Sequence, residues 1–148
     1  MRKKKNDSII FENIEVLDAG AKGVSVAKAP DGKVIFIPNV VPGDCIDVKT
    51  FRKRKAYYEG KAIKFHSYSP HRVTPVCEHF GACGGCKWQT LPYEKQLKYK
   101  QQQVIDQLKR IGHIQLPEIM PIIGGAEQRY YRNKLEYTFS NKKYLTSE

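Results

Sequence analysis

Short apolar runs separated by turn residues fill the first part of the chain, and no stretch between Ser8 and Phe65 has the period of a helix. Apolar runs of about four to eight residues bounded by glycine, proline and aspartate are typical of β-strands. The pattern predicts five short strands, at residues 9–17, 24–27, 34–37, 45–50 and 56–63. We expect them to form a small closed antiparallel barrel of the OB kind, because closure removes exposed sheet edges.

The turns between these strands have their own chemistry. Ala29-Pro30-Asp31-Gly32 suits a hairpin, and Val41-Pro42-Gly43-Asp44 places proline second and glycine third, as a type II turn requires. Cys45 lies in the strand that follows, where we expect it to be a small core residue.

The periodicity disappears between His66 and Thr90, where prolines and glycines keep the backbone irregular. One helix should follow, with Thr90 as its N-cap, Pro92 in its first turn and Gly112 just past its end. Its apolar residues share one face and predict that the helix packs against something; they are Tyr93, Leu97, Val104, Leu108 and Ile111.

Two further strands are predicted after the helix, within Pro117–Ile123 and at Tyr137–Ser140. The fold class is therefore α+β, in three parts. Residues 1–66 form the barrel, residues 67–112 an irregular cysteine loop and a helix, and residues 113–148 the start of a mixed α/β central domain. Since the last strand has no visible partner, we expect the protein to be truncated.

The charge balance points to an anionic partner. Lysine and arginine number 26 against 15 acidic residues, which gives a formal net charge of +11. The mean hydropathy is −0.56, and no apolar run approaches the ~18 residues that a membrane span needs. No apolar signal-peptide core follows the basic amino end. We expect a cytoplasmic, monomeric protein without membrane contact; solvated lysines on an ordinary basic protein are the alternative.

Three cysteines within ten residues, Cys77, Cys83 and Cys86, predict a metal site. In a reducing cytoplasm, thiolates serve as ligands for zinc or iron–sulfur clusters more often than they form disulfides. Zinc is the serious alternative, with a fourth ligand from His66, His71 or His79. One close pair and one outlying cysteine favour a cluster loop whose fourth ligand comes from elsewhere.

Basic and aromatic residues occur together at two places that suit RNA. Arg52, Lys53, Arg54 and Lys55 precede Tyr57, and Arg132 and Lys134 follow a tyrosine pair. Such clusters combine phosphate attraction with rings on which bases stack, although a solvated loop has the same composition. Phe80 and Trp88 flank the cysteines, where we expect them to shield the cluster.

The segment Cys77-Glu78-His79-Phe80-Gly81-Ala82-Cys83-Gly84-Gly85-Cys86-Lys87-Trp88-Gln89 resembles the iron–sulfur motif of the RNA uracil-5-methyltransferases, in particular the 23S rRNA (uracil-5-)-methyltransferases. Two later segments, Tyr93-Glu94-Lys95-Gln96-Leu97 and Tyr131-Arg132-Asn133-Lys134-Leu135-Glu136, resemble the helix and the opening of the central domain in that family. The barrel resembles its TRAM domain, which holds RNA.

This resemblance implies a 4Fe-4S cluster bound by Cys77, Cys83, Cys86 and a fourth cysteine of the central domain, which this chain lacks. It implies S-adenosylmethionine as methyl donor and RNA as substrate, ribosomal rather than transfer RNA. The catalytic cysteine and base would lie beyond Glu148, so no catalytic residue is assigned here and the chain alone should be inactive. The alternative is a stand-alone metal-containing RNA-binding module without catalysis.

Overall fold

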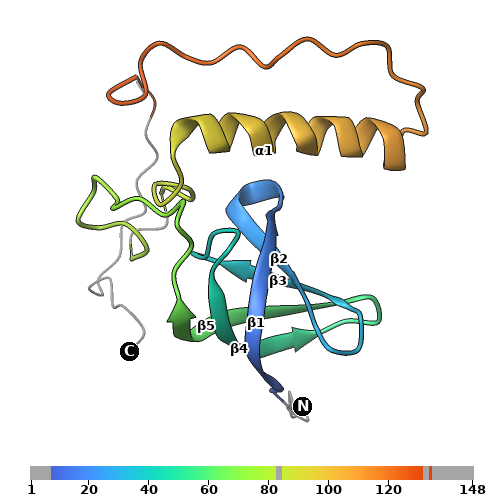
Figure 1. The fold of residues 1–148 in the computed structure, drawn as a ribbon, viewed down its shortest axis with the longest axis vertical. Coiled ribbons are helices and arrows are strands. Elements are labelled where there is room, and N and C mark those ends of the chain that lie inside the picture. The colour runs from blue at the N-terminus through green and yellow to red at the C-terminus, as the bar shows by residue number, and fades with distance from the viewer. Residues whose placement is uncertain (1–7, 83–84, 132–133, 135–148) are drawn as a thin grey trace.

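A computed structural model describes residues 8–82, 85–131 and 134 of the chain (Figure 1). Five strands form a closed barrel in the order β1-β2-β3-β5-β4. They are β1 (Ile10–Ala19), β2 (Val24–Lys28), β3 (Val34–Pro38), β4 (Cys45–Lys53) and β5 (Tyr57–Ser67). The predicted five-strand OB-like barrel is confirmed.

The pairing of β3 with β5 is the one departure from the predicted antiparallel barrel. These two strands are parallel, with Val34 opposite Tyr57 and Phe36 opposite Glu59, whereas the other strand pairs are antiparallel. The reason is topological. β4 pairs with β1 to close the barrel, so β5 returns along β4 and meets β3 in the same direction.

The core lies inside the barrel and alternates with exposed positions along each strand, as a pleated strand requires. Its buried apolar residues are Ile14, Val16, Ala27, Ala29, Ile35, Ile37, Val40, Ile46, Val48 and Tyr58. Cys45 is not among them: it is half-buried, on the opposite side of β4 from Ile46. The expectation of a core role for Cys45 was therefore wrong.

A single helix, α1 (Tyr93–Asp106), follows the cysteines and continues as one π-helical turn (Gln107–Ile111) that ends at Gly112, as predicted. Thr90 is not its cap; Pro92 is, without a side-chain hydrogen bond. The buried Thr90 instead accepts a hydrogen bond from the Val73 N–H at its carbonyl, 2.9 Å away. No helix in the described ranges is long and apolar enough to cross a bilayer.

The predicted packing of the helix face is wrong in part. Val104 and Ile111 are 56% and 77% exposed, and α1 has no buried residue. α1 crosses one end of the barrel (Figure 1), where the Gln103 side-chain amide donates to the Ala19 carbonyl at 2.9 Å. The contact with the barrel is therefore partly polar.

Residues 113–131 contain no strand, so the strand predicted within Pro117–Ile123 is wrong. No neighbouring strand lies beside this segment in the described part of the chain. It returns past α1 (Figure 1), where Gln101 bonds the Met120 carbonyl and the Ile122 N–H at 3.1 Å each. The strand predicted at Tyr137–Ser140 and most of the expected central domain lie outside the described residues.

Candidate nucleic-acid interface and cysteine segment

The predicted basic cluster lies at the tip of the β4–β5 hairpin. Arg52 and Lys53 end β4, and Arg54 and Lys55 form the turn. The Arg54 N–H donates to the Tyr57 carbonyl at 2.8 Å, which closes the turn. All four basic side chains are exposed. The structure therefore brings Arg52, Lys53, Arg54, Lys55 and Tyr57 together at one place.

Their charges are not equally available to a phosphate. Arg52 donates from Nη1 to both carboxylate oxygens of Glu59, each 3.2 Å away, so its charge is largely compensated within the protein. The Lys53 ammonium lies 5.9 Å from the ring centre of Tyr58, within cation–π range. The turn residues Arg54 and Lys55 are the more available pair.

The two tyrosines after the turn face different ways. Tyr57 is half-buried and meets Phe36 edge-on, with ring centres 5.4 Å apart. Tyr58 is 3% exposed inside the barrel, so it has no face for a base. Its hydroxyl donates to Asp31 at 2.8 Å, and Lys33 lies 3.0 Å from the same carboxylate. The Tyr58 hydrogen bond, followed by that of Lys33, lowers the pKa of Asp31 to about 2.

The second predicted basic site is described only in part. Arg132 lies outside the described residues, and Lys134 is exposed.

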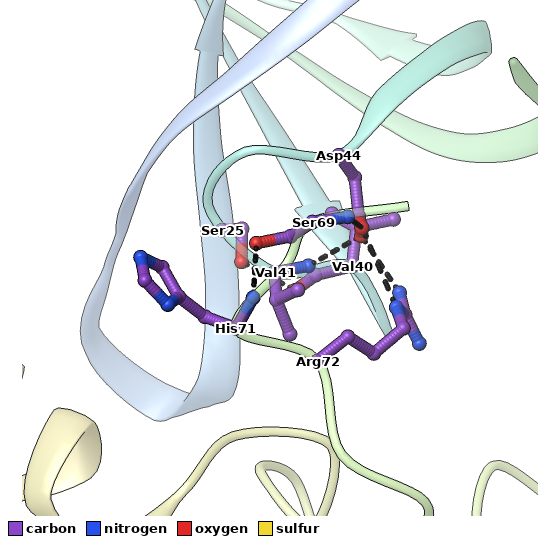
Figure 2. A network of polar contacts seen from close by, with 7 residues as sticks. All are labelled: Ser25, Val40, Val41, Asp44, Ser69, His71 and Arg72. Carbon is purple, nitrogen blue, oxygen red and sulfur yellow. Dashed lines mark hydrogen bonds and ion pairs between the residues drawn. The ribbon is translucent and has the colours of Figure 1, made fainter. Parts of the chain in front are cut away.

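A buried carboxylate that sequence reasoning treated only as a turn residue joins the barrel to the segment after it. Asp44 is fully buried. Figure 2 shows its carboxylate among Val41, Ser69 and Arg72. Its Oδ2 accepts from the Val41 N–H at 2.8 Å and from Arg72 Nη2 at 2.7 Å, and its Oδ1 accepts from the Ser69 N–H at 2.9 Å. We call Asp44 and these three partners the Asp44 network.

The Arg72 guanidinium is also covered by aromatic rings. It lies 5.3 Å from the ring centre of Phe65 and 5.2 Å from that of Tyr68, and the two rings stack 4.9 Å apart. A guanidinium that is both paired and stacked on rings is held more firmly than a solvated one. The residues that follow β5, from Tyr68 to Arg72, are therefore held against the barrel by these contacts.

The residues that follow, 70–92, are called here the cysteine segment. Cys77 and Cys86 are exposed, and Cys83 lies outside the described residues. The Cys77 N–H donates to the side-chain oxygen of Gln89 at 3.1 Å, and its carbonyl accepts from the Phe80 N–H at 3.1 Å. The first bond links residues 77 and 89 of the segment, and the second closes a turn from Cys77 to Phe80.

The donor chemistry of this segment suits a soft metal or an iron–sulfur cluster, because thiolates are their preferred ligands. Within the described residues, no three His, Cys, Asp or Glu side chains form a group that could hold a metal ion. The three-cysteine site includes Cys83, so it stays a prediction. The Trp88 Nε1–H group is buried and has no hydrogen-bond acceptor in the described part of the chain. This unsatisfied donor belongs to a residue only two positions after Cys86 in the sequence.

The end of the cysteine segment packs against the barrel and begins α1. Gly23, the residue just before β2, has φ +73° and touches Lys87 so closely that an added Cβ would collide with the lysine Cβ. The Gln96 amide donates to the carbonyls of Trp88 and Leu91, at 3.1 and 2.9 Å. Barrel, cysteine segment and helix are thus in direct contact.

Bacterial proteins named as RNA methyltransferases match most of the chain. An uncharacterized RNA methyltransferase of Bacteroides thetaiotaomicron is 57% identical over 86% of this chain, and one of Porphyromonas gingivalis is 44% identical over 91%. A third, from Chlorobaculum tepidum, is 36% identical over 98%.

The chain spans under a third of the length of these relatives, 28%, 29% and 30% respectively. No protein-family model matches it. The chain is therefore homologous to one portion of these bacterial proteins, over nearly all of its own length.

Proposed function

We propose that this chain is the amino-terminal RNA-binding and iron–sulfur portion of an S-adenosylmethionine-dependent RNA (uracil-5-)-methyltransferase that acts on 23S rRNA in the cytoplasm. The observation that carries the proposal is the 57% identity to a protein named as an RNA methyltransferase over 86% of the chain. The OB-like barrel and the cysteine spacing are in keeping with it.

In this proposal the barrel captures RNA and brings no catalytic group. Arg54 and Lys55 attract phosphates at the hairpin tip, and Tyr57 offers part of a ring beside them. Arg132 and Lys134 would add a second basic contact. The net charge of +11 favours encounter with a polyanion.

Cys77, Cys83 and Cys86 would hold a 4Fe-4S cluster together with a cysteine from outside this sequence. When bound, the cluster supplies metal–thiolate bonds that order a segment with little apolar surface of its own. The protein contributes the Asp44 network, which fixes where the segment starts, and the Lys87 contact with Gly23, which fixes where it ends.

The direct test uses the complete gene product that carries this sequence. We expect it to transfer a labelled methyl group from S-adenosylmethionine to carbon 5 of a uridine in unmodified 23S rRNA, as read by mass spectrometry of the digested RNA. Methylation of a different base, or of transfer RNA alone, would contradict the proposal. RNA binding without any methyl transfer would favour the alternative, a metal-containing RNA-binding module.

A further inference from the structure

A stack of two aromatic rings lies where the chain leaves β5. Phe65, near the end of that strand, and Tyr68, just after it, have ring centres 4.9 Å apart and planes 27° from parallel. Phe65 is half-buried and packs against the barrel core, whereas Tyr68 is 64% exposed. The stack therefore has a covered inner ring and an exposed outer ring.

The position of Arg72 shows which face of the Tyr68 ring is open. Phe65 covers one face. The Arg72 guanidinium is almost equally far from both ring centres, 5.2 Å from Tyr68 and 5.3 Å from Phe65. A guanidinium over the outer face of Tyr68 would lie much further from Phe65 than from Tyr68. Arg72 therefore lies beside the stack, and the face of Tyr68 that points away from Phe65 can receive a flat ligand.

The same arginine has one nitrogen left for a ligand. Arg72 donates to Asp44 from Nη2 and Nε, at 2.7 and 3.4 Å. Its Nη1 bonds to no residue that the structure describes and is not buried, and in Figure 2 the third nitrogen points away from the Asp44 carboxylate. Because the buried carboxylate orients the guanidinium, this donor is held in place before a ligand binds.

A flat ring with an anionic group beside it is the ligand that fits these two side chains. A nucleobase can continue the Phe65–Tyr68 stack, and Arg72 Nη1 can donate a charge-assisted hydrogen bond to a phosphate oxygen of the same nucleotide. The Asp44 carboxylate does not repel this phosphate, because it is fully buried and paired with Arg72.

We infer that Tyr68 and Arg72 form a binding site for one unpaired nucleotide of RNA. Its base stacks on the outer face of Tyr68, and its phosphate accepts from Arg72 Nη1. Tyr57 begins β5 and Tyr68 follows its last residue, so this site and the basic hairpin tip lie at opposite ends of one strand. A duplex does not fit, because its bases are already stacked on one another. This inference rests on the proposed function, since it names where and in what form the RNA meets the barrel.

Binding of the complete gene product to a labelled single-stranded RNA, followed by fluorescence anisotropy, tests the site. Loss of one stacked base costs ~1–3 kcal/mol, so Tyr68→Ala should weaken binding about 5- to 150-fold. Tyr68→Phe and Tyr68→Trp should keep the affinity and Tyr68→Leu should lose it, because stacking needs an aromatic face and not the hydroxyl group. Leu17→Ala is the control: Leu17 is an apolar residue 51% exposed on β1.

Stacking is separated from charge by the salt dependence of binding. A stacked ring releases no counterions, so Tyr68→Ala should lower the affinity at every salt concentration and leave the slope of log affinity against log salt unchanged. Tyr68→Trp gives a second readout. Its added tryptophan should be quenched when a base stacks on it, beyond any change in fluorescence that RNA causes in the unaltered protein.

The outcomes separate the inference from the proposed function. If the unaltered gene product binds no RNA, the proposed RNA-binding role itself is wrong. If it binds, but Tyr68→Ala and Tyr68→Leu behave like Leu17→Ala, the nucleotide site is wrong and the RNA lies elsewhere. A changed salt slope in Tyr68→Ala, equal losses in Tyr68→Phe and Tyr68→Ala, or tighter binding to an RNA duplex would also overturn the site.

Discussion

The barrel and the cysteine segment with the helix beyond it differ in what orders them. Inside the barrel Ile35, Ile37 and Ile46 are fully buried and every strand has two neighbours. From residue 70 onward, the only buried side chains in the described ranges are Thr90 and Leu91. A segment with so little burial cannot offset its conformational entropy by apolar packing. Polar contacts to the barrel, and in our proposal metal–thiolate bonds, must contribute the rest.

The largest expected effect is at the junction of the two regions. Asp44→Ala leaves Arg72 and the Val41 and Ser69 N–H groups without their acceptor, and breaking a buried pair in this way costs about 3–5 kcal/mol. Urea denaturation should show this loss of stability. Glu15→Ala, at an exposed position of β1, should change stability by less than about 0.5 kcal/mol. Similar values for both variants would mean that the network does not join the regions.

Truncation of one apolar side chain in each region should show directly how much each region depends on apolar packing. Ile35→Ala creates a cavity in the barrel and should cost about 2–5 kcal/mol. Ile111→Ala, at a position 77% exposed, should stay within about 0.5 kcal/mol. Denaturation followed by circular dichroism measures both. A large loss in Ile111→Ala would show that the helix face is covered in solution.

The contact between Gly23 and Lys87 has a matched pair of variants. Gly23→Ala and Gly32→Ala both place alanine at a positive φ, +73° and +82°, but only the first new methyl group meets another residue. Gly23→Ala should therefore destabilise the protein by about 1–3 kcal/mol more, the usual cost of overpacking. Trp88 fluorescence should change only in Gly23→Ala, because Trp88 follows Lys87. Equal effects would argue against packing of the cysteine segment on the barrel.

The smallest expected effect is a change in the pKa of one carboxylate, that of Asp31. The Tyr58 hydroxyl, ahead of Lys33, lowers the pKa of Asp31 to about 2, so Tyr58→Phe should raise it toward 3.8. Because the folded pKa is the lower one, this carboxylate contributes stability above pH 3.8 and loses it as the pH falls through about 2. NMR titration of Asp31 measures both values. An unperturbed pKa in the unaltered protein would show that the hydrogen bond is absent.

The strands could be predicted because their signal is local. Alternation of buried and exposed residues and the turn chemistry of Gly32 and Gly43 depend on neighbours in sequence, and both glycines have positive φ. The parallel pairing of β3 with β5 has no such signal, because it depends on how β4 closes the barrel.

The partners of the surface and buried polar side chains were harder to predict for the same reason. The run Arg52–Lys55 was conspicuous in sequence, yet Glu59, seven residues away, compensates Arg52. Lys49 and Lys61 are far apart in sequence and meet only through the strand register. Asp44 could not be assigned its partners Ser69 and Arg72, which lie 25 and 28 residues further along the chain.

The measurement that tests the account most directly is the iron, sulfide and zinc content of the complete gene product, purified without oxygen. We predict iron and acid-labile sulfide in equal amounts, lost in Cys77→Ser, Cys83→Ser and Cys86→Ser but kept in Cys45→Ser, with the barrel still folded in every variant. Zinc in place of iron and sulfide, or a protein without metal whose cysteine segment is nevertheless ordered, would contradict it.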